Sequence, residues 1–404
     1  MTSKQRNHVT DLRGVTRMAI DATTGLTDLV EALHTRIARA PAGLGGPVVA
    51  GAVNGITGLV YKSIRGVTRA VGGGIDALLA QLSPLLGEMG SSSAREALVA
   101  ALNGVLGDYL AATGNPLAIA MRLRRHGQAL ELTREGLAAA IPSPSAKVAV
   151  LVHGLCMNDR QWEREGHDHG AALARDLLFT PVYLHHNTGL HVATSGAAFA
   201  ELLEALVAAW PVPIEELVIV AHSMGGLVAR SAHHSGTAAN HGWPRQLRKL
   251  VMLGTPHHGA PLERGGHWID ILLEKTLYTA PFARLGKIRS AGITDLRHGS
   301  VLEEDWRGRD RFAHGETPRR PVALPDGVRC YAIAATTGKS AGDLSDRLLG
   351  DGLVPLASAL GRHPDPRFAL AFPPVNQWIA YDTGHLELLS KAAVYERIRS
   401  WLAD

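Results

Sequence analysis

The sequence predicts an α/β fold built on a mostly parallel sheet. Short, nearly continuous apolar runs occur at 147–152, 216–221 and 249–254, as expected of strands that are buried on both faces. Segments with helical character separate these runs, one of them at 197–210 and another directly after Ser223. This alternation is typical of a parallel sheet whose strands are connected by helices.

Further elements extend this pattern along the chain. Runs at 181–186 and 328–335 are also predicted to be strands, and two short runs on either side of His126-Gly127 indicate a hairpin. Residues 260–325 interrupt the rhythm, with a helical segment at "IDILLEKTL", and are predicted to form a cap insertion over one end of the sheet.

Residues 1–113 differ from the rest because they are predicted to be helical. Leucine-rich stripes lie at 26–37 and 98–110; Asp28 and Glu31 are placed as a capping box in the first, and Ser93 with Glu96 precedes the second. The second stripe stops at Gly114-Asn115-Pro116. We therefore expect a helical N-terminal region, 1–113, followed by an α/β domain, 114–404.

Residues 40–61 of this region are uncharged and carry glycines three or four positions apart. Such a segment favours close helix packing, although contact with a membrane or lipid surface is the alternative. Lys62, Arg65 and Arg69 follow at helical spacing, either as a solvated face or as a patch for anionic lipid.

Composition limits the classes of protein to which the chain can belong. The 404 residues are 46% hydrophobic and 19% charged, which indicates a globular protein, and the formal net charge is only +4. Acidic residues are interleaved with the basic ones, which argues against nucleic acid as a partner. Cys156 and Cys330 are too few for a disulfide framework, and the first residues lack a signal-peptide pattern. A cytoplasmic location, peripheral to a membrane if the N-terminal helices bind one, is expected.

The segment "AHSMGG" (221–226) carries the clearest chemical signal. It follows an apolar strand and precedes a helix, so Ser223 is expected at the sharp turn that exposes a nucleophilic serine. Ala221 stands where the usual Gly-x-Ser-x-Gly pattern has its first glycine, whereas Gly225 matches the second. One added methyl group is a small departure, and the alternative is a serine that merely caps the helix.

The rest of a hydrolase site is predicted at the ends of other strands. The backbone N–H groups of Leu155, after His153-Gly154, and of Met224 would bind an oxyanion. Downstream, Asp351 lies in a glycine-flanked turn and His385 precedes the last helix, which gives the order Ser, Asp, His. Other acidic residues could orient the imidazole instead: Asp343, Asp346 and Asp382.

With its blocks "HG", "HSMGG", "GTPHHG", "DGLVP" and "GH", the sequence resembles the α/β-hydrolase superfamily over roughly 117–404. The resemblance is to its lipase and esterase branch, including lipases similar to the GPI inositol deacylase group. It implies an α/β-hydrolase fold, a Ser223–His385–Asp351 triad and hydrolysis of an apolar acyl ester through an acyl-enzyme. It implies no cofactor, and it makes Ala221 acceptable because some bacterial lipases carry alanine there.

The chain contains 20 histidines, some of them in adjacent pairs. Neighbouring residues on a strand point to opposite faces and do not readily share one ion, so no metal site is predicted. His257 and His258 follow a strand and either line the active-site cleft or pack in the core. The residues predicted to contact substrate are His153, Gly154, His222, His257 and His258.

Two other functions fit the same residues. An acyltransferase or a polyester hydrolase would use the same acyl-enzyme, with another acceptor or a polymeric substrate. A protein of a different class would bind a lipid surface or a partner through its N-terminal helices and retain only residual hydrolase activity. Cys156 as the nucleophile is disfavoured because it lies outside a strand-to-helix turn of this kind.

Overall fold

The computed structural model describes residues 93–260, 290–307, 319–340 and 350–404. The chain divides into two units, Met1–Arg95 with Thr276–Ile288 and Glu96–Lys275 with Arg289–Asp404. Nearly all described residues belong to the second unit, which contains the whole sheet. The predicted helices at 26–37 and at "IDILLEKTL", and the uncharged segment 40–61, lie outside the described residues.

The sheet of the second unit has eight strands in the order β2-β1-β4-β3-β5-β6-β7-β8. The strands from β4 to β8 in this order are parallel to one another, and the β1–β2 hairpin joins the β4 edge in antiparallel pairing. This mixed, mostly parallel sheet confirms the predicted α/β-hydrolase fold. The strands are β1 (Arg122–Arg125), β2 (Gln128–Ala129), β3 (Lys147–Val152), β4 (Thr180–His185), β5 (Glu216–His222), β6 (Leu247–Leu253), β7 (Arg329–Ala335) and β8 (Gln377–Ala380).

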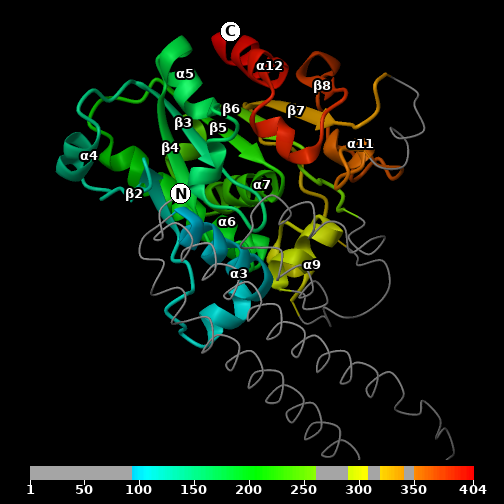
Figure 1. Cartoon of the computed structure of the whole chain (residues 1–404), viewed down its shortest axis with the longest axis horizontal. Coiled ribbons are helices and arrows are strands. Elements are labelled where there is room, and N and C mark those ends of the chain that lie inside the picture. Colours follow the sequence, from blue (N-terminus) through cyan, green and yellow to red (C-terminus); the bar gives the residue numbers. More distant parts are fainter. Residues whose placement is uncertain (1–92, 261–289, 308–318, 341–349) are drawn as a thin grey trace, which may run out of the picture. The chain divides into compact units, whose positions relative to one another are not determined.

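Helices cover both faces of this sheet (Figure 1). Helices α5 and α12 pack together and bury the apolar face that includes Val218, Val220 and Leu253. On the other face α6 packs on α7, where Gly196 lies against Ser231. The described α-helices are α3 (Ser93–Ala112), α4 (Arg134–Ala140), α5 (His169–Leu177), α6 (Val192–Ala209), α7 (Met224–Ala238), α9 (Ala291–His298), α11 (Leu356–Ala359) and α12 (Ala392–Ala403). Short 3-10 helices are η1 (Asp159–Trp162), η2 (Trp243–Arg245), η4 (Glu303–Asp305), η5 (Pro374–Asn376) and η6 (His385–Leu389).

Helix α3 lies at the domain boundary that the sequence placed at residue 113. The structure groups this helix, from Glu96 onward, with the sheet. Its glycines allow close contact: a Cβ atom on Gly104 would lie 2.2 Å from Cys156 Sγ, and one on Gly107 would lie 1.8 Å from Asn187 Oδ1. The Ser290 hydroxyl also donates a 2.7 Å hydrogen bond to the Gly104 carbonyl. Small residues on α3 therefore make it part of the structure that supports the carboxyl ends of β3 and β4.

Most predicted strands are present with small shifts in their ends. The 147–152 strand is β3 itself, and the hairpin turns at His126 (φ 50°) and Gly127 (φ 73°), both in the left-handed region. Strand β8 was not predicted because it has only four residues and three of them are partly exposed. By length and composition alone α6 is apolar enough to span a membrane, although one of its faces packs on α7.

Candidate active site

Ser223 occupies the turn between β5 and α7 with a strained backbone. Its φ of 54° and ψ of −125° are unusual for a residue with a side chain. The turn is held on both sides, because the Ser223 amide donates a 2.8 Å hydrogen bond to the Leu253 carbonyl and the Gly226 amide donates one of 3.0 Å to the Ser223 carbonyl. This is the geometry expected of a nucleophile at a strand-to-helix turn.

The glycine pattern around this turn has a steric explanation. A Cβ atom on Gly225 would lie 2.4 Å from the Val152 carbonyl oxygen and 2.8 Å from that of His153, so the start of α7 contacts the end of β3 directly. Ala221 instead lies within β5, paired with Val152 and Met252, where its methyl group is buried. The second glycine of the pattern is therefore required here, whereas the first position accommodates alanine.

His385 and Asp351 form a buried pair. His385 Nδ1 lies 2.6 Å from Asp351 Oδ2, and both side chains are almost fully excluded from solvent. The other carboxylate oxygen accepts hydrogen bonds from the amides of Leu353 (3.0 Å) and Val354 (2.8 Å). Asp351 is thus fixed in orientation, and because a carboxylate only accepts, the imidazole donates from Nδ1 and leaves Nε2 without that proton.

The other acidic residues do not make this contact in the described part of the chain. Asp382 is an exposed turn residue with φ of 48°, and its amide donates to the Gly338 carbonyl. Asp343 and Asp346 lie outside the described residues.

Two contacts bring His385 to the same end of the sheet as Ser223. The His222 ring lies 4.7 Å from that of His385, centroid to centroid, and its Nε2 is 3.1 Å from the His385 carbonyl oxygen. Gly254, directly after β6, has φ of 57°, and a Cβ atom there would lie 3.0 Å from His385 Cε1. Only glycine fits this position without displacing the imidazole. His222 therefore acts as a packing partner of His385, and burial holds its pKa well below the usual value.

The 153–157 loop presents backbone amides beside Ser223. Gly154 is close enough that a Cβ atom would lie 3.0 Å from Ser223 Cβ. Among the described residues no acceptor faces the amide of Leu155 or that of Met224. The Gly154 carbonyl accepts hydrogen bonds from His153 Nδ1 (3.0 Å) and the Met157 amide (3.3 Å). Because the peptide is planar and trans, holding this carbonyl also fixes the direction of the Leu155 N–H.

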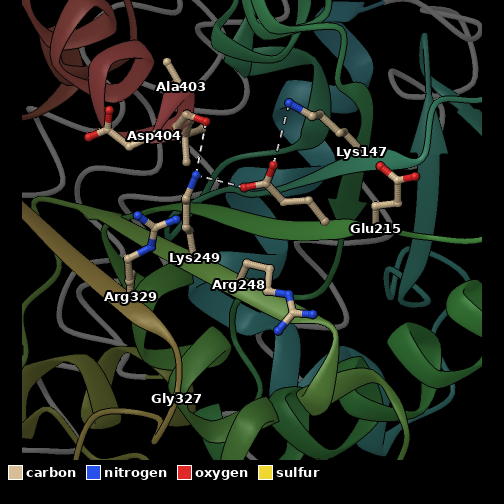
Figure 2. A pocket seen from close by; sticks show the side chains of 10 residues that line it. Lys147, Glu215, Arg248, Lys249, Gly327, Arg329, Ala403 and Asp404 are labelled. Carbon is tan, nitrogen blue, oxygen red and sulfur yellow. Dashed lines mark hydrogen bonds and ion pairs between the residues drawn. The ribbon is translucent and has the colours of Figure 1, made fainter.

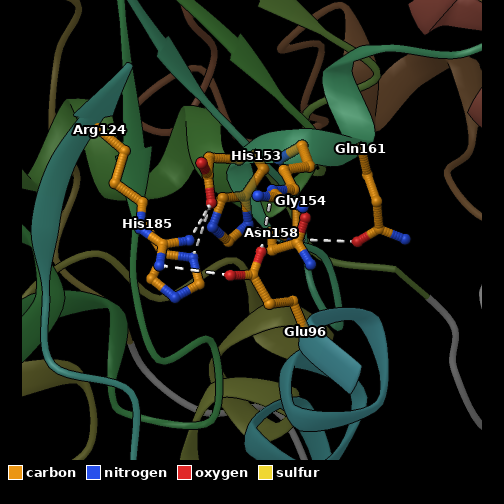
Figure 3. A network of polar contacts seen from close by, with 9 residues as sticks. Glu96, Arg124, His153, Gly154, Asn158, Gln161 and His185 are labelled. Carbon is orange, nitrogen blue, oxygen red and sulfur yellow. Dashed lines mark hydrogen bonds and ion pairs between the residues drawn. The ribbon is translucent and has the colours of Figure 1, made fainter. Parts of the chain in front are cut away.

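A network of charged and aromatic groups lies beside this loop (Figure 3). Arg124 Nη1 and His185 Nδ1 lie 2.9 Å and 3.0 Å from Asp159 Oδ1. Glu96 of α3 contacts the same arginine at 3.6 Å, which ties the helix to the network. The His153 ring stacks on His186 at 4.4 Å. Burial lowers the pKa of His153 to about 4, so this imidazole is neutral at ordinary pH.

His257 and His258 lie in a different environment from the His385–Asp351 pair. His257 Nδ1 is 3.4 Å from Nη1 of Arg230 on α7, and burial holds its pKa well below the usual value. The His258 amide donates a 3.1 Å hydrogen bond to the Ser358 hydroxyl. The ring of His258 lies 4.9 Å from that of His363. In the part of the chain that the structure describes, no group of three or more metal-ligating side chains is close enough to hold an ion.

Some residues at the site carried no signal in the sequence. His169 at the start of α5 contacts the Leu388 carbonyl through Nε2 at 2.9 Å and so holds η6, the 3-10 helix that begins with His385. This pairing spans 219 residues, and a lone histidine does not reveal it. Gly254 falls within the "GTPHHG" block, which marked its loop but not its contact with the imidazole.

A pocket of about 390 Å³ lies at the amino-terminal ends of the strands, and Figure 2 shows residues that line it. Lys147, Glu216 and Arg329, which line it, are the first residues of β3, β5 and β7. Ser223 follows the last residue of β5, about 20 Å away at the usual rise per residue of a strand. The pocket is therefore separate from the Ser223 site.

Comparison with known proteins finds a family model that matches part of the chain. Residues 144–318 match the family model described as PGAP1-like alpha/beta domain. The matched segment contains Ser223 and the 153–157 loop, and it ends before Asp351 and His385. This match confirms the predicted resemblance to the α/β-hydrolase superfamily. No curated protein matches the chain.

Several solved structures are similar to the chain at low sequence identity. The mature form of the Bacillus licheniformis lipase BlEst2 is 17% identical, with a TM-score of 0.42 over 70% of this chain and 98% of that one. The carboxylesterase CesB of Bacillus subtilis is 13% identical, with a TM-score of 0.36 over 64% and 84%. Lipase B of Aspergillus fumigatus is 11% identical, with a TM-score of 0.39 over 66% and 57%.

Proposed function

We propose that the protein is a serine hydrolase of carboxylic esters. The observation that carries this proposal is the strained turn at Ser223 beside a buried imidazole–carboxylate pair, His385 and Asp351, held at 2.6 Å. A serine that only capped α7 would need neither the positive φ nor this pair. No side-chain cap hydrogen bond is made by Ser223.

The proposed reaction gives each of these groups a role. Ser223 Oγ attacks the ester carbonyl carbon while its proton passes to Nε2 of His385. Asp351 accepts the Nδ1 proton in a hydrogen bond, which keeps Nε2 basic and stabilises the imidazolium. The carbonyl oxygen becomes an oxyanion, and the amides of Leu155 and Met224 bind it.

Breakdown of this tetrahedral intermediate releases the alcohol and leaves an acyl-enzyme. The alkoxide leaving group takes the proton from Nε2 of His385 as its bond to the acyl carbon breaks. A water molecule then gives its proton to the same nitrogen and attacks the acyl group, and collapse returns the proton to Ser223 Oγ and frees the carboxylic acid.

The support for the 153–157 loop contributes to this chemistry without touching the substrate. His153 donates from Nδ1 to the Gly154 carbonyl, and this hydrogen bond keeps the Leu155 N–H directed to one side of the loop. A preformed donor costs no reorganisation when the negative charge develops. We expect an apolar acyl group as the preferred substrate, in line with the lipase and esterase resemblance.

Hydrolysis of p-nitrophenyl esters of increasing acyl length tests the proposal. Ser223→Ala is expected to lower kcat by at least about 10³-fold, because loss of a triad member removes the covalent route. Ser231→Ala is the matched control, since Ser231 is another buried serine on α7 and has no role in the mechanism. Comparable activity in the Ser223→Ala and Ser231→Ala proteins would refute the assignment of the nucleophile.

A further inference from the structure

Two buried or partly buried arginines near the candidate active site have no carboxylate partner. Arg230 on α7 is 5% exposed, and Arg319 is partly buried. Among the described residues, neither guanidinium forms an ion pair. Arg230 Nη2 donates a 2.6 Å hydrogen bond to the Val322 carbonyl, and Arg319 Nη1 donates to the carbonyls of His257 (3.2 Å) and Gly299 (2.9 Å).

Other buried or partly buried cations of the same unit form ion pairs with carboxylates. Lys249, which is 1% exposed, lies 2.9 Å from Glu216 Oε1 (Figure 2), and Arg124 lies 2.9 Å from Asp159 Oδ1. A buried charge without a counter-charge is energetically unfavourable, so a pairing of this kind is the usual arrangement. Among the described residues no carboxylate pairs with Arg230, and this needs a reason.

The carboxylate of Asp305 raises the pKa of both arginines through its charge, but its hydrogen bonds go elsewhere. Asp305 is buried, and its oxygens accept hydrogen bonds from three backbone amides, those of Val301, Leu302 and Arg320. Burial, with the neighbouring Arg319 adding to the effect, lowers the pKa of Arg230 to about 10. The guanidinium therefore keeps its charge at neutral pH.

The unused hydrogen-bonding groups of the cluster are all donors. Arginine can only donate, so His257 Nδ1 accepts from Arg230 Nη1 at 3.4 Å, and the ring proton of His257 is then on Nε2. Both Arg230 Nε and His257 Nε2 are buried and have no hydrogen-bond partner. Arg319 contributes further N–H groups from a partly exposed position. A set of neighbouring donors with positive charge and, among the described residues, no free acceptor is complementary to an anion.

The cluster is also close to the candidate nucleophile. Arg230 follows Ser223 by seven residues of α7, which corresponds to about 10 Å along the helix axis. The Cα–Cβ bond of a helical residue tilts toward the N-terminus of its helix, which for Arg230 is the end at which Ser223 lies. His257 belongs to the loop that begins at Gly254, the residue against the His385 ring.

We propose that Arg230, Arg319 and His257 form a subsite for an oxyanion, a carboxylate or phosphate group, carried by the ester substrate. This inference rests on the proposed function, and it modifies the expectation of a wholly apolar acyl ester: the ester also carries a charge on the order of 10 Å from the scissile carbonyl. A free inorganic anion offers the same chemistry and is the alternative source of the ligand.

The first experiment measures anion binding without catalysis. In the Ser223→Ala protein, inorganic phosphate at ten times its Kd is expected to raise Tm by about 3 °C relative to chloride at equal ionic strength. Arg319→Gln should abolish this difference. Arg248→Gln, which removes an exposed arginine on β6 in the pocket of Figure 2, should preserve it. Equal Tm differences in all three proteins would show only general salt stabilisation and would overturn the proposal.

The second experiment asks whether the anion belongs to the substrate. The probes are p-nitrophenyl monoesters of dicarboxylic acids and neutral p-nitrophenyl esters of the same chain length. Arg319→Gln and Arg230→Lys should each lower the anionic-to-neutral ratio of kcat/KM by about tenfold or more, because hydrogen bonds to charged groups are lost, and Arg248→Gln should not.

Phosphate binding together with an unchanged ratio would assign the cluster to a free anion and overturn the substrate role. If neither ester is hydrolysed, the proposed function fails, while the phosphate measurement still decides whether the cluster binds anions.

Discussion

Acidification is expected to destabilise the protein through histidines that fold in the neutral state. His153 and His169 are fully buried, and burial lowers the pKa of each to about 4. In the unfolded chain an imidazole titrates near its usual pKa of about 6.5. Between these two values the unfolded state binds more protons than the folded state, so the stability of the fold decreases as the pH falls from about 6.5 to about 4.

The size of the effect follows from the difference between these pKa values. At pH 5.5 an imidazole with a pKa of about 6.5 is about 90% protonated, and one with a pKa of about 4 is about 3% protonated. Relative to pH 8, this difference reduces the free energy of unfolding by about 1.4 kcal/mol for each histidine, or about 3 kcal/mol for both. Burial also lowers the pKa of His186, His222 and His257, which adds to the same trend. The loss is a substantial fraction of the total stability of a typical domain.

Urea unfolding at pH 8 and pH 5.5, followed by tryptophan fluorescence, measures this loss. His169→Gln keeps a donor for the Leu388 carbonyl but removes the titrating ring, so its stability should fall by about 1.4 kcal/mol less than that of the wild type between the two pH values. His126→Asn is the control, since His126 is exposed in the hairpin turn and asparagine tolerates its positive φ. A pH dependence in His169→Gln equal to that of the wild type would refute the reasoning.

Two further predictions concern the acid of the triad and the N-terminal region. Asp351→Asn should lower kcat by about 10⁴-fold because the amide favours the wrong imidazole tautomer, whereas Asp382→Asn should change it only a few-fold; steady-state kinetics that rank them in reverse order would move the acid to Asp382. The full-length protein should co-sediment with anionic liposomes at low salt, and Lys62→Glu with Arg65→Glu should weaken this binding, since each near-surface cation contributes about 1 kcal/mol. Protein that stays in the supernatant would instead favour the packing role for residues 40–61.

The sequence predicted the features that depend on neighbouring residues. The run ending at His222, the turn at Ser223 and the small residue at position 225 are local, so the strand, the strained turn and the helix could be predicted together. The ends of β3 and the hairpin at His126 could also be predicted, because a buried strand and a left-handed turn each have a characteristic local pattern. The sequence left four candidate acids, and the structure shows that Asp351 is the one that lies against His385.

Features that depend on distant contacts could not be predicted. Arg230 meets Val322 across 92 residues, and nothing in either segment indicates that a guanidinium will be buried there with no ion pair among the described residues. Helix α3 was recognised as a helix, but its assignment to the N-terminal region missed the contacts that Gly104 and Gly107 allow with the loops after β3 and β4. Local periodicity specifies that a helix forms, whereas its place in the fold depends on complementary surfaces far along the chain.

Covalent labelling with a fluorophosphonate tests the central claim most directly, because these reagents react with a serine that an adjacent imidazole activates. Intact mass spectrometry followed by peptide mapping should find one adduct per chain, on Ser223, and none in the Ser223→Ala protein. Slower labelling is expected in Asp351→Asn. An adduct on another residue, or undiminished labelling of the Ser223→Ala protein, would contradict the assignment of Ser223 as the nucleophile of an ester hydrolase.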